Sequence, residues 1–282
     1  MAETKNVKRD SKGAQRIIMG AAGLFLGCLF LFPIYILVLN SFKNTKGIFT
    51  DVIGFPNAAT FTLVNYPNAF EALEYIRSFV NSLTITVIAT VLILLISAMA
   101  AWVLVRYKTK TSKIIFFLFA ASMLIPFQCV MLPLVGFASR IGIMNPQGLI
   151  FMYMGFGSSM SIVMFHSFIK NIPEELEEAA TIDGAKSSHI LRYIILPLLM
   201  PSITQCLFLS MVNSLKVYDL NISLTNGNPF RLSEAVTMNV YQTAFSSNLM
   251  GYGSAKALLL VLVIAGVSLI QVAITSSKEV EL

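Results

Sequence analysis

Charged residues are scarce in this sequence. Only 12% of the 282 residues are Asp, Glu, Lys or Arg, about half of the ~25% that soluble domains usually carry. Hydrophobic residues make up 56% of the chain, and they gather in runs of the length that a bilayer requires. The sequence therefore predicts an integral membrane protein. Although the formal net charge is +6, no basic stripe interleaves with aromatic residues, so we expect no nucleic-acid partner.

Cysteine and histidine are also scarce, which argues against a metal site or a disulfide framework. Cys28, Cys129 and Cys206 each lie within an apolar run, without paired spacing. The chain lacks the G-x-x-x-x-G-K-[ST] loop that cradles phosphates, and it has neither an H-E-x-x-H nor a G-x-S-x-G motif. We expect no catalytic residue, no metal and no cofactor in this chain, and we do not expect an enzyme.

Six apolar runs are long enough to cross about 30 Å of hydrocarbon as helices. They lie near Ile17–Leu39, Phe79–Val105, Ile114–Ala138, Leu149–Phe168, Leu198–Leu220 and Tyr252–Ile274. Pro126 and Pro133 should kink or break the third run. The expected fold class is therefore an all-α integral membrane protein with six transmembrane helices.

The distribution of basic residues predicts the orientation in the membrane. The two densest clusters of Lys and Arg lie in residues 1–16 and 106–113, and both face the cytoplasm if the N-terminus does. The positive-inside rule therefore favours N-in and C-in. The expected organisation is a cytoplasmic tail (1–16), a first transmembrane helix (17–39), an extracytoplasmic loop (40–77), a membrane core (78–275) and a cytoplasmic tail (276–282).

The cytoplasmic loop 171–197 is the most charged stretch outside the N-terminal tail. Pro173 suits the start of a helix, and Glu174 and Glu175 in the first turn complement the helix dipole. Gly184 is a natural left-handed cap at the helix end, after which Ser187 or Ser188 can cap a second short helix. The loop therefore predicts a helix, a glycine turn and a second helix on the cytoplasmic surface.

The same loop carries a motif with fixed spacing. Its residues are Glu178-Ala179-Ala180, then Gly184, then Ile194, Leu196 and Pro197. This pattern resembles the E-A-A loop of ABC importer permeases. The longer string PEELEEAATIDGA resembles the binding-protein-dependent carbohydrate permeases of the maltose type, and the resemblance extends over roughly the whole chain.

The resemblance implies a type I ABC importer permease fold in which loop 171–197 of the core is the coupling helix that docks on a cytoplasmic ATPase. The docking residues by this resemblance are Glu174, Glu175, Leu176, Glu178, Ala179, Ala180, Asp183, Gly184, Ile194 and Pro197. The implied partners are a homologous second permease, two ABC ATPase subunits that use ATP and Mg, and an extracytoplasmic solute-binding protein. The implied location is the bacterial cytoplasmic membrane.

The function that the resemblance implies is import of a carbohydrate, such as a di- or oligosaccharide. A permease for another solute, such as an amino acid or a phosphate compound, is an alternative. An ion-driven secondary carrier is disfavoured, because the central runs hold almost no carboxylates. The sequence does not identify the sugar.

Candidate residues for the substrate path are the polar groups at membrane depth, which are costly unless they face a cavity or a partner. They are Gln128, Asn213, Lys216, Tyr218 and Asp219. Lys216 and Asp219 are three residues apart and can pair on one helix face. The alternative is that this segment lies at the outer interface. In the resembling family, the loop equivalent to 221–251 can contact the binding protein.

Overall fold

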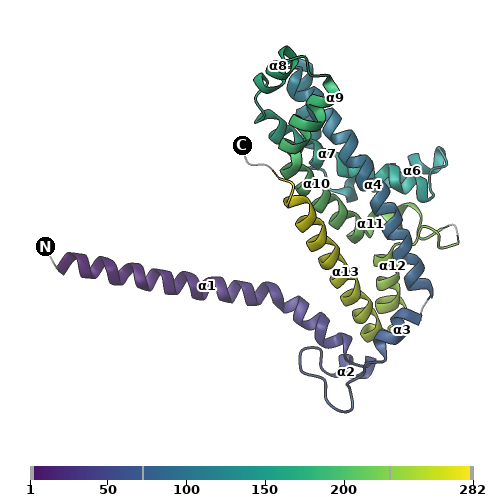
Figure 1. Cartoon of the computed structure of the whole chain (residues 1–282). Helices are drawn as coiled ribbons and strands as arrows, with labels where there is room; N and C mark the ends of the chain where they lie inside the picture. The colour runs from purple at the N-terminus through teal and green to yellow at the C-terminus, as the bar shows by residue number, and fades with distance from the viewer. Residues whose placement is uncertain (1–2, 72, 229, 280–282) are drawn as a thin grey trace. The chain divides into compact units, whose positions relative to one another are not determined.

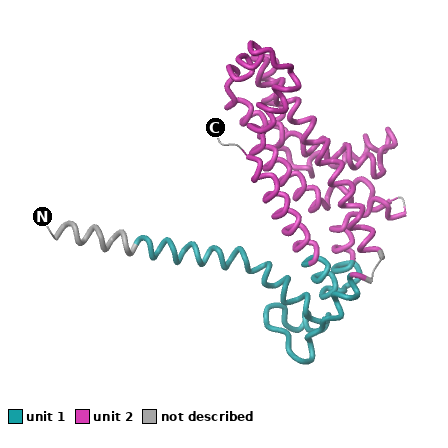
Figure 2. The backbone as a smooth tube through the Cα atoms, viewed as in Figure 1, with its two compact units in different colours: residues 1–69, 243–258 teal, residues 70–242, 259–282 magenta. Residues whose placement is uncertain are grey.

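The computed structural model describes residues 3–71, 73–228 and 230–279, with side chains for 15–70, 74–228 and 230–279. Within these residues the chain is helical, and its only extended pairing is an isolated bridge between Lys43 and Phe61. Two compact units are distinguished in Figure 2: residues 1–69 with 243–258, and residues 70–242 with 259–282.

The first unit contains α1 (Glu3–Ser41), α2 (Thr45–Thr50), α3 (Asn65–Glu71) and the first turns of α13 (Met250–Ser276). Its connections are held by bonds to backbone carbonyls. The buried ammonium of Lys43 donates to the carbonyl of Asp51 at 2.7 Å, and the Asn65 amide donates to the carbonyls of Ser41 and Lys43. The segment expected as a loop at 40–77 therefore contains two short helices, and α1 already begins within the segment expected as a tail.

The second unit is built around three long helices, α4, α7 and α10, which pack side by side, with α8 and α9 beyond one end of them (Figure 1). Its elements are α4 (Leu73–Arg106), α5 (Lys110–Ser122), α6 (Phe127–Arg140), α7 (Pro146–Lys170), α8 (Glu175–Ile182), α9 (Ser187–Ile190), η1 (Leu191–Ile195), α10 (Leu196–Lys216), α11 (Asp219–Leu224), α12 (Val236–Tyr241) and the end of α13. A second π turn, η2 (Gln242–Ser246), follows α12.

Small residues let α4 and α7 approach closely. Ala89 and Ala101 of α4 are fully buried, and each lies in a separate apolar cluster along the α4–α7 contact. Phe165 and Ile169 of α7 pack in the cluster around Ala101, and Leu149 packs in the cluster around Ala89. Close packing at small residues is the usual basis of helix association in membranes, where lipid offers no hydrophobic gain.

Five helices in the described chain are long and apolar enough to span a membrane. They are Gln15–Ser41, Glu74–Arg106, Pro146–Lys170, Ser187–Lys216 and Met250–Ser276. Helices α5 and α6 form a sixth span only if they are counted together, because a bend of 103° separates them. The predicted break in this run is confirmed at Pro126, which has no N–H and which disfavours helix at the residue before it. The other proline, Pro133, lies inside α6.

Candidate functional site

Loop 171–197, which was expected to dock on an ATPase, folds as a helix, a glycine turn and a second helix. Two residues after the end of α8, Gly184 has φ +82°, a conformation that costs most residues with a Cβ about 1–2 kcal/mol and that only asparagine and aspartate adopt at lower cost. The amides of Gly184 and Ala185 donate to the carbonyls of Thr181 and Ala180, which closes the helix end. The predicted turn is confirmed.

The expected serine cap of the second helix is wrong. Lys186 is the residue before α9, and its backbone is extended, with no capping bond from its side chain. Ser187 is already the first helical residue, so its hydroxyl is not placed to cap the helix.

One face of α8 is exposed and partly apolar. Leu176 is 39% exposed and Ile182 is 85% exposed, and Glu178, Ala179 and Asp183 are exposed around them. Leu176 and Ile182 therefore leave apolar surface of α8 uncovered among the described residues. We call Leu176, Glu178, Ala179, Ile182 and Asp183 the exposed α8 face.

The other side of α8 is tied to α4 by ion pairs. Arg106, the last residue of α4, places Nη2 2.5 Å from Oε1 of Glu177, and Lys108 places Nζ 2.9 Å from Oε1 of Glu174. The guanidinium of Arg106 also lies 4.6 Å from the ring centre of Trp102, and it donates to the carbonyl of Ile172 at 3.4 Å. These contacts attach the helix to the end of a membrane span.

Electrostatics support the same attachment. The hydrogen bond from Lys108, its charge and the nearby charge of Arg106 hold the pKa of the Glu174 carboxyl below its ordinary value, against a small opposing effect of burial. The sequence analysis assigned Glu174 to docking and did not single out Arg106 or Glu177. The available signal was a basic cluster at the end of one span and an acidic helix on the same side of the membrane.

Ile194 and Pro197, also assigned to docking, lie in the stem that joins α9 to α10. Ile194 is part of the π turn η1 and packs against the core cluster that contains Ile190 and Ile195. Pro197 stands in the first turn of α10, and its missing N–H leaves one carbonyl of the preceding turn without the usual bond. The structure therefore places Ile194 in packing that holds the loop and Pro197 in the first turn of α10, both apart from the exposed α8 face.

The five candidate substrate-path residues come together at the far end of α10. Asn213, Lys216, Tyr218 and Asp219 line a cavity of about 400 Å³. Gln128 of α6 joins them by donating from Nε2 to Oδ2 of Asp219 at 3.0 Å. Two further lining residues are aromatic, Phe127 and Phe156.

The expected pairing of Lys216 with Asp219 on one helix face is wrong. Helix α10 ends at Lys216, Val217 is extended, and Asp219 begins α11. Within the described chain, no ion pair joins the two side chains. The break turns the polar groups toward one cavity, an arrangement in which unwound segments at membrane depth can bind a substrate.

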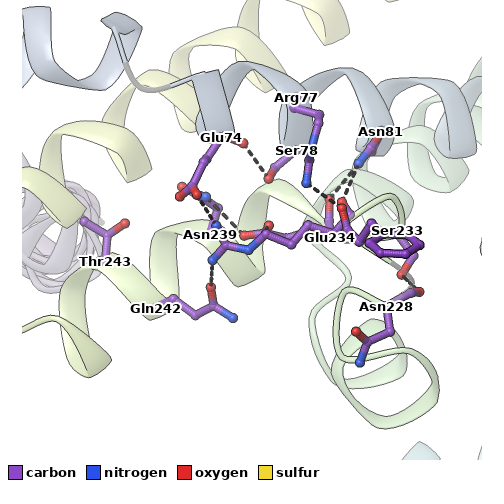
Figure 3. Close-up of polar contacts among 12 residues, drawn as sticks. Glu74, Arg77, Ser78, Asn81, Asn228, Ser233, Glu234, Asn239, Gln242 and Thr243 are labelled. Atoms are coloured by element: carbon purple, nitrogen blue, oxygen red, sulfur yellow. Dashed lines mark hydrogen bonds and ion pairs between the residues drawn. The ribbon is translucent and has the colours of Figure 1, made fainter.

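A polar cluster at the opposite end of α4 was not predicted (Figure 3). Glu234 is only 2% exposed, and it pairs with Nε of Arg231 at 3.2 Å and accepts from Asn239 at 3.1 Å. Arg231 also places Nη1 2.5 Å from Oε1 of Glu74 and donates to Oε1 of Gln242 at 3.1 Å. The polar pattern of this loop alone gave no signal that Glu234 would be buried.

In the same cluster, side chains of α4 bind the backbone of a strained turn. Asn226, Phe230 and Arg231 have φ between 45° and 60°, which is uncommon for residues with a side chain. Arg77 donates to the carbonyl of Phe230 at 2.8 Å, and Asn81 donates to that of Arg231 at 3.2 Å. The turn leaves the Phe230 side chain 86% exposed.

Comparisons with known proteins agree with this architecture. The model of the family "Binding-protein-dependent transport system inner membrane component" matches residues 92–279. The chain is 40% identical over 188 residues to the probable starch degradation products transport system permease protein AmyC of Thermoanaerobacterium thermosulfurigenes, covering 67% of this chain and 68% of that protein. It is 32% identical over 203 residues to the melibiose/raffinose/stachyose import permease protein MelC of Bacillus subtilis, covering 70% and 72%.

A solved structure shares the fold. A chain of a bacterial ABC transporter involved in the import of the acidic polysaccharide alginate superposes with a TM-score of 0.70 at 18% identity, covering 93% of this chain and 97% of that one. The family match, the apolar helices and the permease relatives together show a multi-pass inner-membrane protein. The chain belongs to the family of binding-protein-dependent transport system inner membrane components.

Proposed function

We propose that this chain is a permease subunit of an ATP-driven importer for a carbohydrate, and that α8 couples it to an ATPase. The observation that carries the proposal is the exposed α8 face on a helix whose other side is fastened to α4 by Arg106. A helix with one free apolar face and one anchored face suits the transmission of a partner's motion into a span. The relatives named for starch products and for melibiose, raffinose and stachyose support a di- or oligosaccharide as the substrate.

The proposed topology has six spans, with α5 and α6 as one broken span and both termini in the cytoplasm. The basic segment Arg106–Lys113 and α8 lie at the same end of α4, and this end is cytoplasmic by the positive-inside rule. Single cysteines at Lys186 and Phe230 in a cysteine-free background test this arrangement. A membrane-impermeant maleimide should label Phe230→Cys from outside intact cells and Lys186→Cys only after lysis; the reverse result would overturn the topology.

In this arrangement the subunit pairs with a homologous second permease. Two ABC ATPase subunits, which bind ATP and Mg, dock at the cytoplasmic end, and a solute-binding protein docks at the Phe230 turn. The sugar path passes the cavity of Asn213, Lys216 and Asp219, where amides and charged groups match sugar hydroxyls and the aromatic rings of Phe127 and Phe156 offer apolar platforms.

Recovery of the ATPase with the tagged permease tests the coupling assignment. Glu178→Arg with Ala179→Arg should lose the ATPase from the purified complex, because two arginines would occupy the exposed α8 face. The control is Ser246→Arg with Ser247→Arg, two exposed positions outside this face. Full ATPase recovery with the α8 variant would show that α8 is only a connector.

A ligand screen tests the carbohydrate separately. The cognate binding protein should bind a di- or trisaccharide, and the complex should import that sugar. Binding of an amino acid or a phosphate compound in place of a sugar would overturn this part of the proposal while leaving the coupling role intact.

A further inference from the structure

A second cavity lies at the α8 end of the bundle and has a basic wall. Its volume is about 600 Å³, and it is bounded by the end of α4, the start of α5, the end of α7 and the residues that lead into α8. Arg106, Lys108, Lys113 and Lys170 line it, against two carboxylates, Glu174 and Glu175. It is separate from the sugar cavity and from the exposed α8 face.

The cations of this wall are not all neutralised. Arg106 and Lys108 are paired with Glu177 and Glu174. In the part of the chain that the structure describes, no ion pair engages Lys113 or Lys170. The unpaired Glu175 offsets only one of these two positive charges, so the cavity keeps an excess of positive charge.

Two hydroxyl groups at the start of α5 adjoin the same wall. Thr109 caps the 13-residue helix α5 by accepting from the amide of Ser112 at 3.1 Å, and the two hydroxyls are 2.9 Å apart. Both residues line the cavity. The dipole of α5 favours an anion near its first turn. Because the two hydroxyls bond each other, one of their two hydrogens remains free, and together with the two lysines it forms a set of donors that suits a phosphate group.

The surroundings indicate that the phosphate belongs to a lipid. Lys113 directly precedes a strongly exposed apolar stretch of α5, in which Ile114 is 60% and Phe117 is 68% exposed. Lys170 is the last residue of α7, and Arg106 is the last of α4. Three helix ends thus border one cavity, with an apolar helix face beside it. In the proposed topology these ends lie at the depth of the headgroups, and the apolar face can pack against acyl chains.

We propose that this cavity binds the phosphate headgroup of an anionic membrane lipid through Lys113 and Lys170. The placement of this lipid in the cytoplasmic leaflet rests on the proposed coupling role of α8. Pro173 and Glu174 also line the cavity, so the bound headgroup contacts the segment that enters α8.

Native mass spectrometry of the complete transport complex tests the site. The complex is titrated with dioleoyl phosphatidylglycerol, with dioleoyl phosphatidylcholine and with inorganic phosphate in separate arms. Wild type should retain phosphatidylglycerol in preference to phosphatidylcholine. Lys113→Gln with Lys170→Gln should weaken phosphatidylglycerol binding about 30-fold, since each lysine near an anionic headgroup contributes about 1 kcal/mol, which is about fivefold in affinity.

Two controls isolate the cavity. Lys110→Gln with Lys278→Gln removes the same charge from exposed lysines that do not line it, and binding should stay within twofold of wild type. Lys113→Arg with Lys170→Arg keeps the charge and should restore binding. The proposed site would be overturned if the two glutamine double variants lost phosphatidylglycerol binding equally, or if wild type retained phosphatidylglycerol and phosphatidylcholine equally. If inorganic phosphate saturated the cavity and displaced the lipid, the proposal that a lipid occupies the cavity would be overturned.

These outcomes are independent of sugar transport. If α8 failed to recover the ATPase while the lysine pair still bound phosphatidylglycerol selectively, the coupling assignment would fall and the lipid site would stand. If the ATPase were recovered and lipid selectivity were absent, only the lipid site would fall.

Discussion

The attachment of α8 to α4 can be weakened by changing one residue, and the effect can be measured locally. Replacing Glu177 by alanine removes the carboxylate that lies 2.5 Å from Nη2 of Arg106, in a pair whose side chains are only 13% and 21% exposed. A hydrogen bond between charged partners in such a setting contributes about 2 kcal/mol. The more distant Glu174, 3.8 Å from Arg106, compensates only weakly. Opening of α8 should therefore become about 30-fold more frequent.

Hydrogen exchange of the α8 amides measures this opening in the permease purified without the ATPase, where the exposed α8 face has no ATPase bound to it. A helix of eight residues has little stability of its own, so protection of residues 175–182 should fall about 30-fold in Glu177→Ala.

The matched control is Glu178→Ala. Both glutamates lie in the first turn of α8, so the changes in helix propensity and in dipole interaction are the same. Glu178 is exposed and has no ion pair among the described residues. Its replacement should change protection less than threefold. Equal loss of protection in the two variants would show that the Arg106 pair does not hold α8, and the reasoning would be refuted.

Four further predictions follow from the geometry. Gly184→Asn should keep sugar uptake because asparagine tolerates a positive φ, whereas Gly184→Asp should abolish uptake, with normal membrane insertion, by adding charge beside the proposed docking face. Asp219→Asn should reduce uptake at least fivefold with unchanged ATPase recovery, since it removes the charge that Gln128 binds. Glu234→Ala should lower the melting temperature of the complex by removing the buried acceptor of Arg231 and Asn239, at a cost of about 2 kcal/mol because Arg231 is partly exposed and keeps Glu74. Because the pKa of Glu174 is lowered, the stability contributed by its bond with Lys108 is fully present at neutral pH and is lost as the pH falls through and below the ordinary carboxyl range, so α8 protection should decline with acidification in wild type and decline less in Glu174→Gln.

Elements whose cause is local were predictable. The apolar runs required helices because lipid offers the backbone no partner, and the break at Pro126 follows from its missing N–H. The left-handed turn at Gly184 was also predictable locally, since glycine has no Cβ and is the usual residue in the left-handed conformation that ends a helix.

Elements that depend on another segment were not predictable. The spacing of Lys216 and Asp219 predicted a shared helix face, but the chain unwinds at Val217 and Asp219 turns to Gln128 of α6. The burial of Glu234 depends on Arg231 and on α4 side chains about 150 residues away in the chain. A local pattern carries no information about which distant residue supplies a partner.

The sequence by itself determined the class of the protein, its membrane helices and the helix–turn–helix of loop 171–197, because each is set by solvation or by backbone chemistry within a few residues. The tertiary structure decided how those parts act together. It paired Arg106 with Glu177. It also brought Asn213, Lys216, Tyr218 and Asp219 to one cavity, where Gln128 binds Asp219, and it left Lys113 and Lys170 lining another cavity. Ion pairs and cavities form between segments, so their partners exist only once the helices have packed.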